Sequence, residues 1–149
     1  MNFIVFVYHG GTEYGGVRTP TQENVARWAI DRGADLVVMH HPHVVQGFDV
    51  YNNRSICYSL GNFCFGGNTN PDDKDSAILQ QTVIREPDGT VHLGELKRIP
   101  CSVSSVQTHN DFQPTPYAVD SEEYSRTLSK LDGSWEKHQL SASNRPELG

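Results

Sequence analysis

Four of the seven histidines in this 149-residue chain follow one of two short apolar segments, namely His9, His40, His41 and His43. Neutral imidazole is a good ligand for zinc, manganese and iron, so two loops that each supply imidazoles can form part of a metal site. Pro42 lies inside the His-His-Pro-His sequence, where it fixes the backbone and holds the flanking rings in a set relation. The cluster indicates a metal or phosphate site. The alternative is that these histidines are structural or merely exposed.

Two further groups of residues could contribute to such a site. Glu13 lies four residues after His9 and is a candidate general acid or base, although a glutamate beside a glycine-rich turn is often only solvated. Gly61 and Asn62 lie in the segment 58–66 and suit a tight turn. Asn62 either lines the crevice or only shapes that turn. The remaining histidines are expected to be surface residues: His92, His109 and His138.

The two apolar segments are predicted to be strands that position the histidines. Segment 3–8 is nearly all apolar, as is typical of a strand buried on both faces in a parallel sheet. A helix should follow, with Thr19 as its cap, Pro20 at its first position and Gly33 as its stop. Segment 35–39 is then a second strand, which completes a right-handed βαβ unit. Since ligands bind at the carboxyl ends of parallel strands, both histidine groups should face one crevice.

The rest of the chain predicts antiparallel hairpins and a second helix. The expected elements are a hairpin over 50–59, a hairpin from strands 78–85 and 90–98, a strand at 103–106 and a helix at 122–131. The fold class is therefore α/β, with a βαβ unit followed by antiparallel hairpins. One domain is expected over 1–132, followed by a polar tail over 133–149 for which disorder is one interpretation.

Composition narrows the classes of function. The 12 basic and 18 acidic residues give a formal charge of −6, which does not favour nucleic-acid binding. No apolar run approaches the roughly 20 residues of a membrane span, and the first residues do not resemble a secretion signal. The three cysteines form no CxxC pair and are expected to be free thiols. The sequence also lacks the GxSxG, Walker-type and GxGxxG motifs.

Three successive motifs resemble the signatures of the CapA-type proteins. They are His9 to Tyr14, Gly33 to Gly47 and Tyr58 to Phe63, and they follow the order found in that family. These bacterial capsule and poly-γ-glutamate synthesis proteins are similar to the calcineurin-like metallophosphoesterases. The region around Phe112 to Pro114 is also similar to the end of the family domain. The resemblance covers most of residues 3–117.

The resemblance implies a four-layer α/β/β/α sandwich with a metal-centred crevice. By position in the motifs, the implied ligands of a divalent metal (Mn, Zn or Fe) are His9, His41 and His43. The implied catalytic residues are Glu13, at the acidic position of the family, and His40, at a variable position beside the ligands. Gly10 departs from the pattern, since tryptophan is usual there. The implied chemistry is metal-assisted hydrolysis of a phosphate ester or a related bond.

Other motifs of the family are absent from the chain. Such proteins normally begin with Gly-Asp, Asn-Leu-Glu and Asn-Asn-His segments, so the chain is expected to be the C-terminal half of the domain. A dinuclear site uses about six to eight donors, so the isolated chain can lack the metal. Missing strands would leave a sheet edge and an apolar face uncovered. The expected partner is therefore the missing N-terminal half, or a second copy that pairs through the uncovered edge.

Two functions from different classes follow as expectations. The first is a capsule or poly-γ-glutamate biosynthesis protein with a metallophosphoesterase-like site, incomplete in this chain and hydrolytic once completed. The second is a non-catalytic binding or assembly module of an envelope polymer complex, and an inert fragment is a third interpretation. An anionic polymer or a phosphate-containing molecule is the expected substrate. The resemblance implies the cell envelope or the extracellular space, whereas the residues themselves indicate no compartment.

Overall fold

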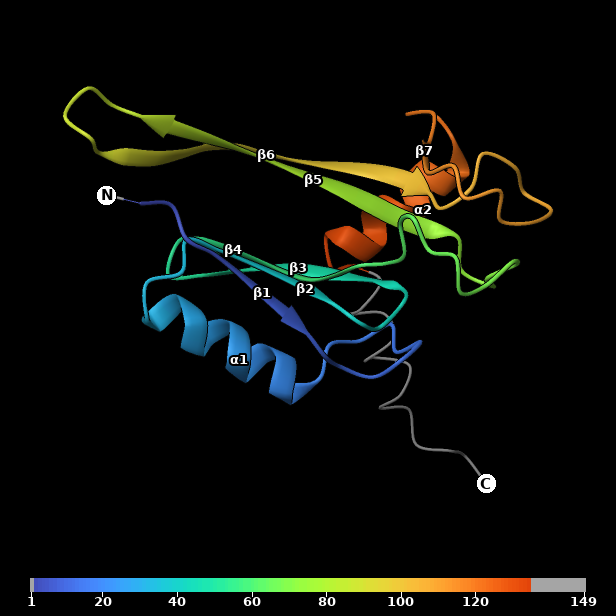
Figure 1. Ribbon diagram of the computed structural model, residues 1–149, viewed down its shortest axis with the longest axis horizontal. Helices are drawn as coiled ribbons and strands as arrows, with labels where there is room; N and C mark the ends of the chain where they lie inside the picture. The colour runs from blue at the N-terminus through green and yellow to red at the C-terminus, as the bar shows by residue number, and fades with distance from the viewer. Residues whose placement is uncertain (1, 135–149) are drawn as a thin grey trace.

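The computed structural model describes residues 2–134, which form two β-sheets and two α-helices (Figure 1). The first sheet has the strand order β1-β2-β4-β3, and the second has the order β5-β6-β7. The elements are β1 (Val5–His9), α1 (Pro20–Asp31), β2 (Leu36–His40), β3 (Val45–Tyr51), β4 (Arg54–Leu60), β5 (Asp75–Arg85), β6 (Val91–Ser102), β7 (Thr115–Pro116) and α2 (Glu122–Leu131). The predicted α/β class is confirmed.

The predicted βαβ unit is present at the start of the chain. Strands β1 and β2 pair in parallel, and the last pair in their register is His9 with His40. Helix α1 begins where expected, because the Thr19 side chain accepts a hydrogen bond from the backbone of Gln22 and Pro20 occupies the first turn. One face of the helix packs on the sheet, and the two together form an apolar core: Ala26, Ala29, Ile30, Val37, Met39 and Ile56.

The first predicted hairpin consists of β3 and β4. Asn52 and Asn53 form its turn with φ angles of 48° and 58°, which suit the right-handed twist of a two-residue hairpin. Strand β4 also pairs in parallel with β2, so it lies inside the first sheet. This arrangement brings the end of β4, and the turn that follows it, beside the end of β2.

The second predicted hairpin is longer than expected, with β5 and β6 paired from Asp75 to Ser102. The expected strand at 103–106 is wrong. In its place the Ser104 hydroxyl donates to the carboxylate of Asp111, and the backbone N–H of Ser105 donates to the same carboxylate. Side chains that bond the local backbone compete with a sheet ladder, which explains why β6 ends at Ser102.

Helix α2 lies between the two sheets. It begins after the cap Ser121, as predicted, and its Leu131 packs with Val45 of the first sheet and Ala77 of the second. Figure 1 shows α1 on one side of the first sheet and the second sheet on the other. Residues 2–134 therefore form α, β and β layers. The fourth layer of the expected sandwich is not seen among them, because α2 packs between the two sheets through Leu131.

The expectation that the first strand is buried on both faces is wrong. Strand β1 is the edge of the first sheet, with Val5 43% and Val7 63% exposed. Phe6 and Tyr8 pack against the core beneath α1, whereas Val5 and Val7 on the opposite face stay exposed although the second sheet lies on that side of the first (Figure 1). Most of the predicted tail, residues 135–149, lies outside the described residues. Within the described part, no helix is long and apolar enough to cross a membrane.

Candidate metal centre

The two predicted histidine groups face one crevice at the carboxyl ends of β1 and β2. Parallel pairing sets His9 beside His40, and the chain then turns so that the ring of His41 lies against the ring of His9. The Nδ1 atom of His41 is 3.2 Å from the Nε2 atom of His9. The predicted grouping of these loops is therefore confirmed.

A turn with positive φ angles orients the imidazoles in the loop after β2. His41 and His43 have φ angles of 109° and 60°, a region that residues with a side chain rarely adopt. The loop after β1 holds this turn, since the backbone N–H of Tyr14 donates to the carbonyl of Pro42 at 2.8 Å. The backbone N–H of Gly10 also donates to the carbonyl of His40. These two bonds fix the position of one loop relative to the other.

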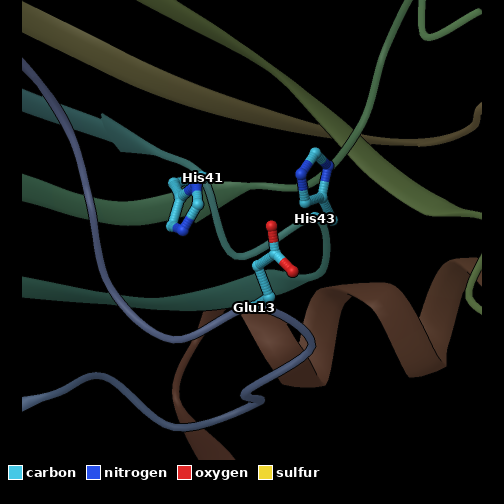
Figure 2. Close-up of side chains that lie close together, drawn as sticks. All are labelled: Glu13, His41 and His43. Atoms are coloured by element: carbon cyan, nitrogen blue, oxygen red, sulfur yellow. The ribbon is translucent and has the colours of Figure 1, made fainter. Parts of the chain in front are cut away.

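Three potential ligands come together between the loops. One donor atom from each of Glu13, His41 and His43 lies within 4.8 Å of the other two. Figure 2 shows the carboxylate of Glu13 directed toward the space between the two imidazole rings. Glu13 is exposed, whereas both histidines are partly buried. The structure thus places Glu13, expected as a catalytic residue, among the potential ligands, and it places His9 in contact with His41.

Asn62 forms two polar contacts with His43. The Nδ1 atom of His43 is 2.7 Å from Oδ1 of Asn62, and Nδ2 of Asn62 donates to the backbone carbonyl of His43 at 3.3 Å. The preceding Gly61 has a φ of 73°, so the prediction of a tight turn is confirmed. The sequence leaves open whether Asn62 lines the crevice, and the structure shows that it does so in addition to its contact with His43.

A buried pair of glutamines supports the loop that carries Glu13. Gln46 Nε2 donates to the carbonyl of Gly15 at 2.7 Å and to that of Val17 at 3.2 Å. Gln22 Nε2 donates in turn to Gln46 Oε1 at 2.8 Å. Neither glutamine was predicted from the sequence. The available signal for Gln46 was a polar side chain among the apolar residues at the start of its strand, because a buried amide must have partners.

An open cleft of about 680 Å³ leads from the histidines between the two sheets. His40 lines it, and burial, together with the charge of His9, lowers the pKa of His40. Cys64 is exposed in the same cleft, whereas Cys57 and Cys101 are buried, and all three thiols are free as expected. Apolar side chains from both sheets form much of the wall: Leu36, Val38, Leu60, Phe63, Ala77 and Leu79.

The other histidines are not part of this crevice where the structure describes them. His92 lies in β6, in register with Ile84 of the long hairpin. His109 contacts the hydroxyl of Thr108 on an exposed loop. His138 lies outside the described residues. The expected surface positions of His92 and His109 are therefore confirmed.

Comparison with known proteins matches this part of the chain to a bacterial family. The family described as "Bacterial capsule synthesis protein PGA_cap" matches residues 1–67. Residues 1–67, somewhat less than half of the chain, are therefore similar to the PGA_cap family. That region contains β1 to β4 and all the residues of the candidate centre, whereas the second sheet and α2 lie beyond it.

Two relatives have names that agree with the family. The chain is 49% identical over 80 residues to "Capsule biosynthesis protein CapA" of Bacillus anthracis, which is 53% of this chain and 19% of the relative. It is 44% identical over 80 residues to "PGA biosynthesis protein CapA" of Bacillus subtilis (strain 168), which is 53% of this chain and 20% of the relative. The matched region thus spans about a fifth of each relative.

Proposed function

We propose that this chain contributes a divalent metal centre to a capsule or poly-γ-glutamate biosynthesis protein. The main support is the grouping of Glu13, His41 and His43, each with a donor atom within 4.8 Å of the other two. The family match over residues 1–67 and the names of the two Bacillus relatives support the biological process. The match spans about a fifth of each relative. A role of this chain in the biosynthesis that their names describe is therefore proposed, not shown.

The donor set fits a transition metal of the Zn, Mn or Fe class. Imidazoles and a carboxylate are the ligands that these ions take. Two nitrogen ligands of one tetrahedral ion, each bound at about 2.0–2.1 Å, lie about 3.3 Å apart. The 3.2 Å between His9 Nε2 and His41 Nδ1 is compatible with that spacing and also with a hydrogen bond. His9 is therefore proposed as a ligand together with His41 and His43.

The proposed reaction is hydrolysis of a phosphate ester or a related bond. A bound ion would polarise the phosphoryl oxygen and activate water. In the chain itself, Glu13 is exposed at the mouth of the centre and can bind the ion or exchange a proton with the solvent. His40 lines the adjoining cleft and is proposed as a catalytic imidazole that faces the substrate. The substrate class follows as an anionic polymer or a phosphate-containing molecule.

The free edge and face of β1 support a proposal about the partner. Ile4, Val5 and Val7 are all at least 43% exposed on an edge strand that has no neighbour on its outer side within residues 2–134. Soluble proteins rarely leave such an edge and apolar patch uncovered. The proposed cover is the N-terminal half of the same domain, which would also supply further ligands and complete a four-layer sandwich. A second copy of the chain is the alternative.

A binding or assembly module without catalysis is the second candidate. The observation that favours it is the small number of carboxylate ligands compared with imidazoles. In the described part of the chain, Glu13 is the one carboxylate grouped with these histidines. Hydrolytic dinuclear centres commonly add bridging carboxylates. In both candidates the proposed location is the cell envelope or the extracellular space, as the resemblance to the capsule synthesis family implies.

Metal content of the purified chain tests the proposed centre. After incubation with Mn, Zn or Fe and desalting, mass spectrometry should find about one ion per chain. The variant H41A/H43A should lose this ion, whereas H92A, an exposed histidine outside the crevice, should retain it. Full retention of metal by H41A/H43A would refute the assignment. Release of phosphate from p-nitrophenyl phosphate by the loaded chain would favour the hydrolase over the binding module.

A further inference from the structure

We propose that Asn62 is a positioning residue that holds His43 in one tautomer, with the proton on Nδ1 and the lone pair of Nε2 free. The inference deepens the proposed metal centre and rests on it for its biological meaning. The tautomer itself is a property of the metal-free chain. Asn62 would act through His43, although its side chain also lines the cleft.

Two hydrogen bonds determine the orientation of the Asn62 amide. The backbone carbonyl of His43 can only accept, so the atom of Asn62 that lies 3.3 Å from it must be the NH₂ nitrogen. The oxygen of the amide is then the atom 2.7 Å from His43 Nδ1. An amide oxygen has no proton to donate, so Nδ1 must carry the hydrogen of this bond. In the neutral ring, Nε2 is consequently the nitrogen with the free lone pair.

The support for the amide is rigid. Asn62 is only 8% exposed, and it follows Gly61 in a turn that pairs with Ser76 of β5. The Ser76 hydroxyl donates to the carbonyl of Leu60 at the start of the same turn. A side chain at Gly61 would lie 2.7 Å from the backbone oxygen of Asp75, so the turn fits closely against β5. The amide is therefore held by the contact of the first sheet with the second.

Two aromatic rings also lie near the imidazole of His43. The ring of Phe65 lies 5.0 Å from the ring of His43, and the ring of Tyr14 lies 6.0 Å from it. With Nδ1 bonded to Asn62, rotation of the ring would break a short hydrogen bond and displace aromatic contacts. In Figure 2 the His43 ring stands across from His41, with the carboxylate of Glu13 between them. The free Nε2 is thus the nitrogen of His43 available to an ion at this centre.

Residues that hold a ligating histidine in this way have a known range of effects. A partner that binds the second ring nitrogen fixes the orientation and basicity of the first, and its removal typically lowers metal affinity by about 10- to 100-fold. We therefore expect N62L, which keeps the approximate size of the side chain but forms neither hydrogen bond, to weaken metal binding by that factor. N62D retains an acceptor for Nδ1–H and should bind metal more tightly than N62L.

The test records the ¹⁵N and ¹H correlations of His43 in the metal-free chain at pH 8, where an ordinary imidazole is neutral. The wild-type chain should show a single tautomer with the proton on Nδ1. N62D should keep this tautomer, and N62L should give a mixture of both. The matched control S76A removes a hydrogen bond from the same turn without touching His43, so it should keep the wild-type tautomer.

Each result separates the two proposals. A proton on Nε2 of His43 in the wild-type chain, or an unchanged tautomer in N62L, would overturn the role of Asn62. The wild-type measurement needs no variant, so it remains decisive even if N62L does not fold. The expected tautomers in a chain that retains no metal would support the positioning of His43 and would refute a metal centre formed by this chain alone.

Discussion

Replacement of Asp75 by asparagine should destabilise the fold in a manner that depends on pH. Asp75 is 1% exposed at the start of β5, and Arg126 donates to both of its carboxylate oxygens at 2.9 and 2.7 Å. Lys130 approaches one oxygen to 2.8 Å, and the hydroxyl of Tyr117 donates to the other at 3.0 Å. Removal of one member of a buried ion pair costs about 3–5 kcal/mol, since its partners lose their compensation. Arg126 is partly exposed, so we expect about 3 kcal/mol for D75N, at the low end of that range.

The pKa of Asp75 sets the direction of the pH dependence. Burial alone raises this pKa, but the hydrogen bonds and charges of Arg126 and Lys130 outweigh burial and lower the pKa from 3.8 to about 2. A carboxyl group with a depressed pKa stabilises the folded state above its unfolded pKa, and this contribution disappears as the pH falls through the folded pKa. A shift of this size corresponds to about 2 kcal/mol of stability at neutral pH. Roughly half of it should be gone by pH 3.

Urea denaturation at pH 7 and at pH 3 measures the effect. The difference in the free energy of unfolding between the wild-type chain and D75N should be about 3 kcal/mol at pH 7 and about 1 kcal/mol smaller at pH 3. The control variant E95Q removes an exposed carboxylate that lies 3.6 Å from Lys97, and it should change the stability by less than about 0.5 kcal/mol. An equal difference at both pH values for D75N would refute the assignment of a depressed pKa to this carboxylate.

Three further perturbations follow from the structure. Gly61 has a φ of 73°, and a Cβ atom there would lie 2.7 Å from the backbone oxygen of Asp75. G61A should therefore lower the thermal midpoint of unfolding more than G89A, since Gly89 has a φ of 84° but open space around it. Equal effects of the two substitutions would contradict the close fit at Gly61. Q46L should lower the free energy of unfolding, measured by urea denaturation, by about 1–3 kcal/mol, because the carbonyls of Gly15 and Val17 lose their amide donor. An unchanged free energy of unfolding would contradict this role of Gln46. If β1 mediates self-association, V7K should lower the mass measured by sedimentation, and an unchanged dimer would exclude this face.

Local sequence signals were enough to predict most of the secondary structure. Thr19 and Pro20 begin α1 through bonds and dihedral angles that span only a few residues, and Ser121 begins α2 in the same way. Asn52 and Asn53 tolerate the positive φ angles of a two-residue turn, which made the first hairpin predictable. The right-handed βαβ rule then placed the two histidine loops at one end of the sheet.

Contacts between distant segments account for the features that local signals missed. An apolar segment indicates a strand, but the exposure of Val7 depends on which elements cover β1, and these lie far away in the sequence. The strand expected at 103–106 was lost to hydrogen bonds between Ser104 and Asp111, a competition that a count of apolar residues does not register. The position of α2 between the sheets likewise depends on its ion pairs with Asp75, 51 residues earlier.

In the candidate centre, too, some features follow from local sequence signals and others depend on contacts between distant segments. Which histidines gather could be predicted from the residues alone, since His9 and His40 end two strands of one βαβ unit, and such strands run parallel and end at the same edge of the sheet. The approach of Glu13 to His41 and His43 could not, because the position of a loop side chain depends on the tertiary contacts that anchor the loop. Those anchors are buried amides that find partners 19 to 31 residues away, as hydrogen bonding requires of any polar group removed from water.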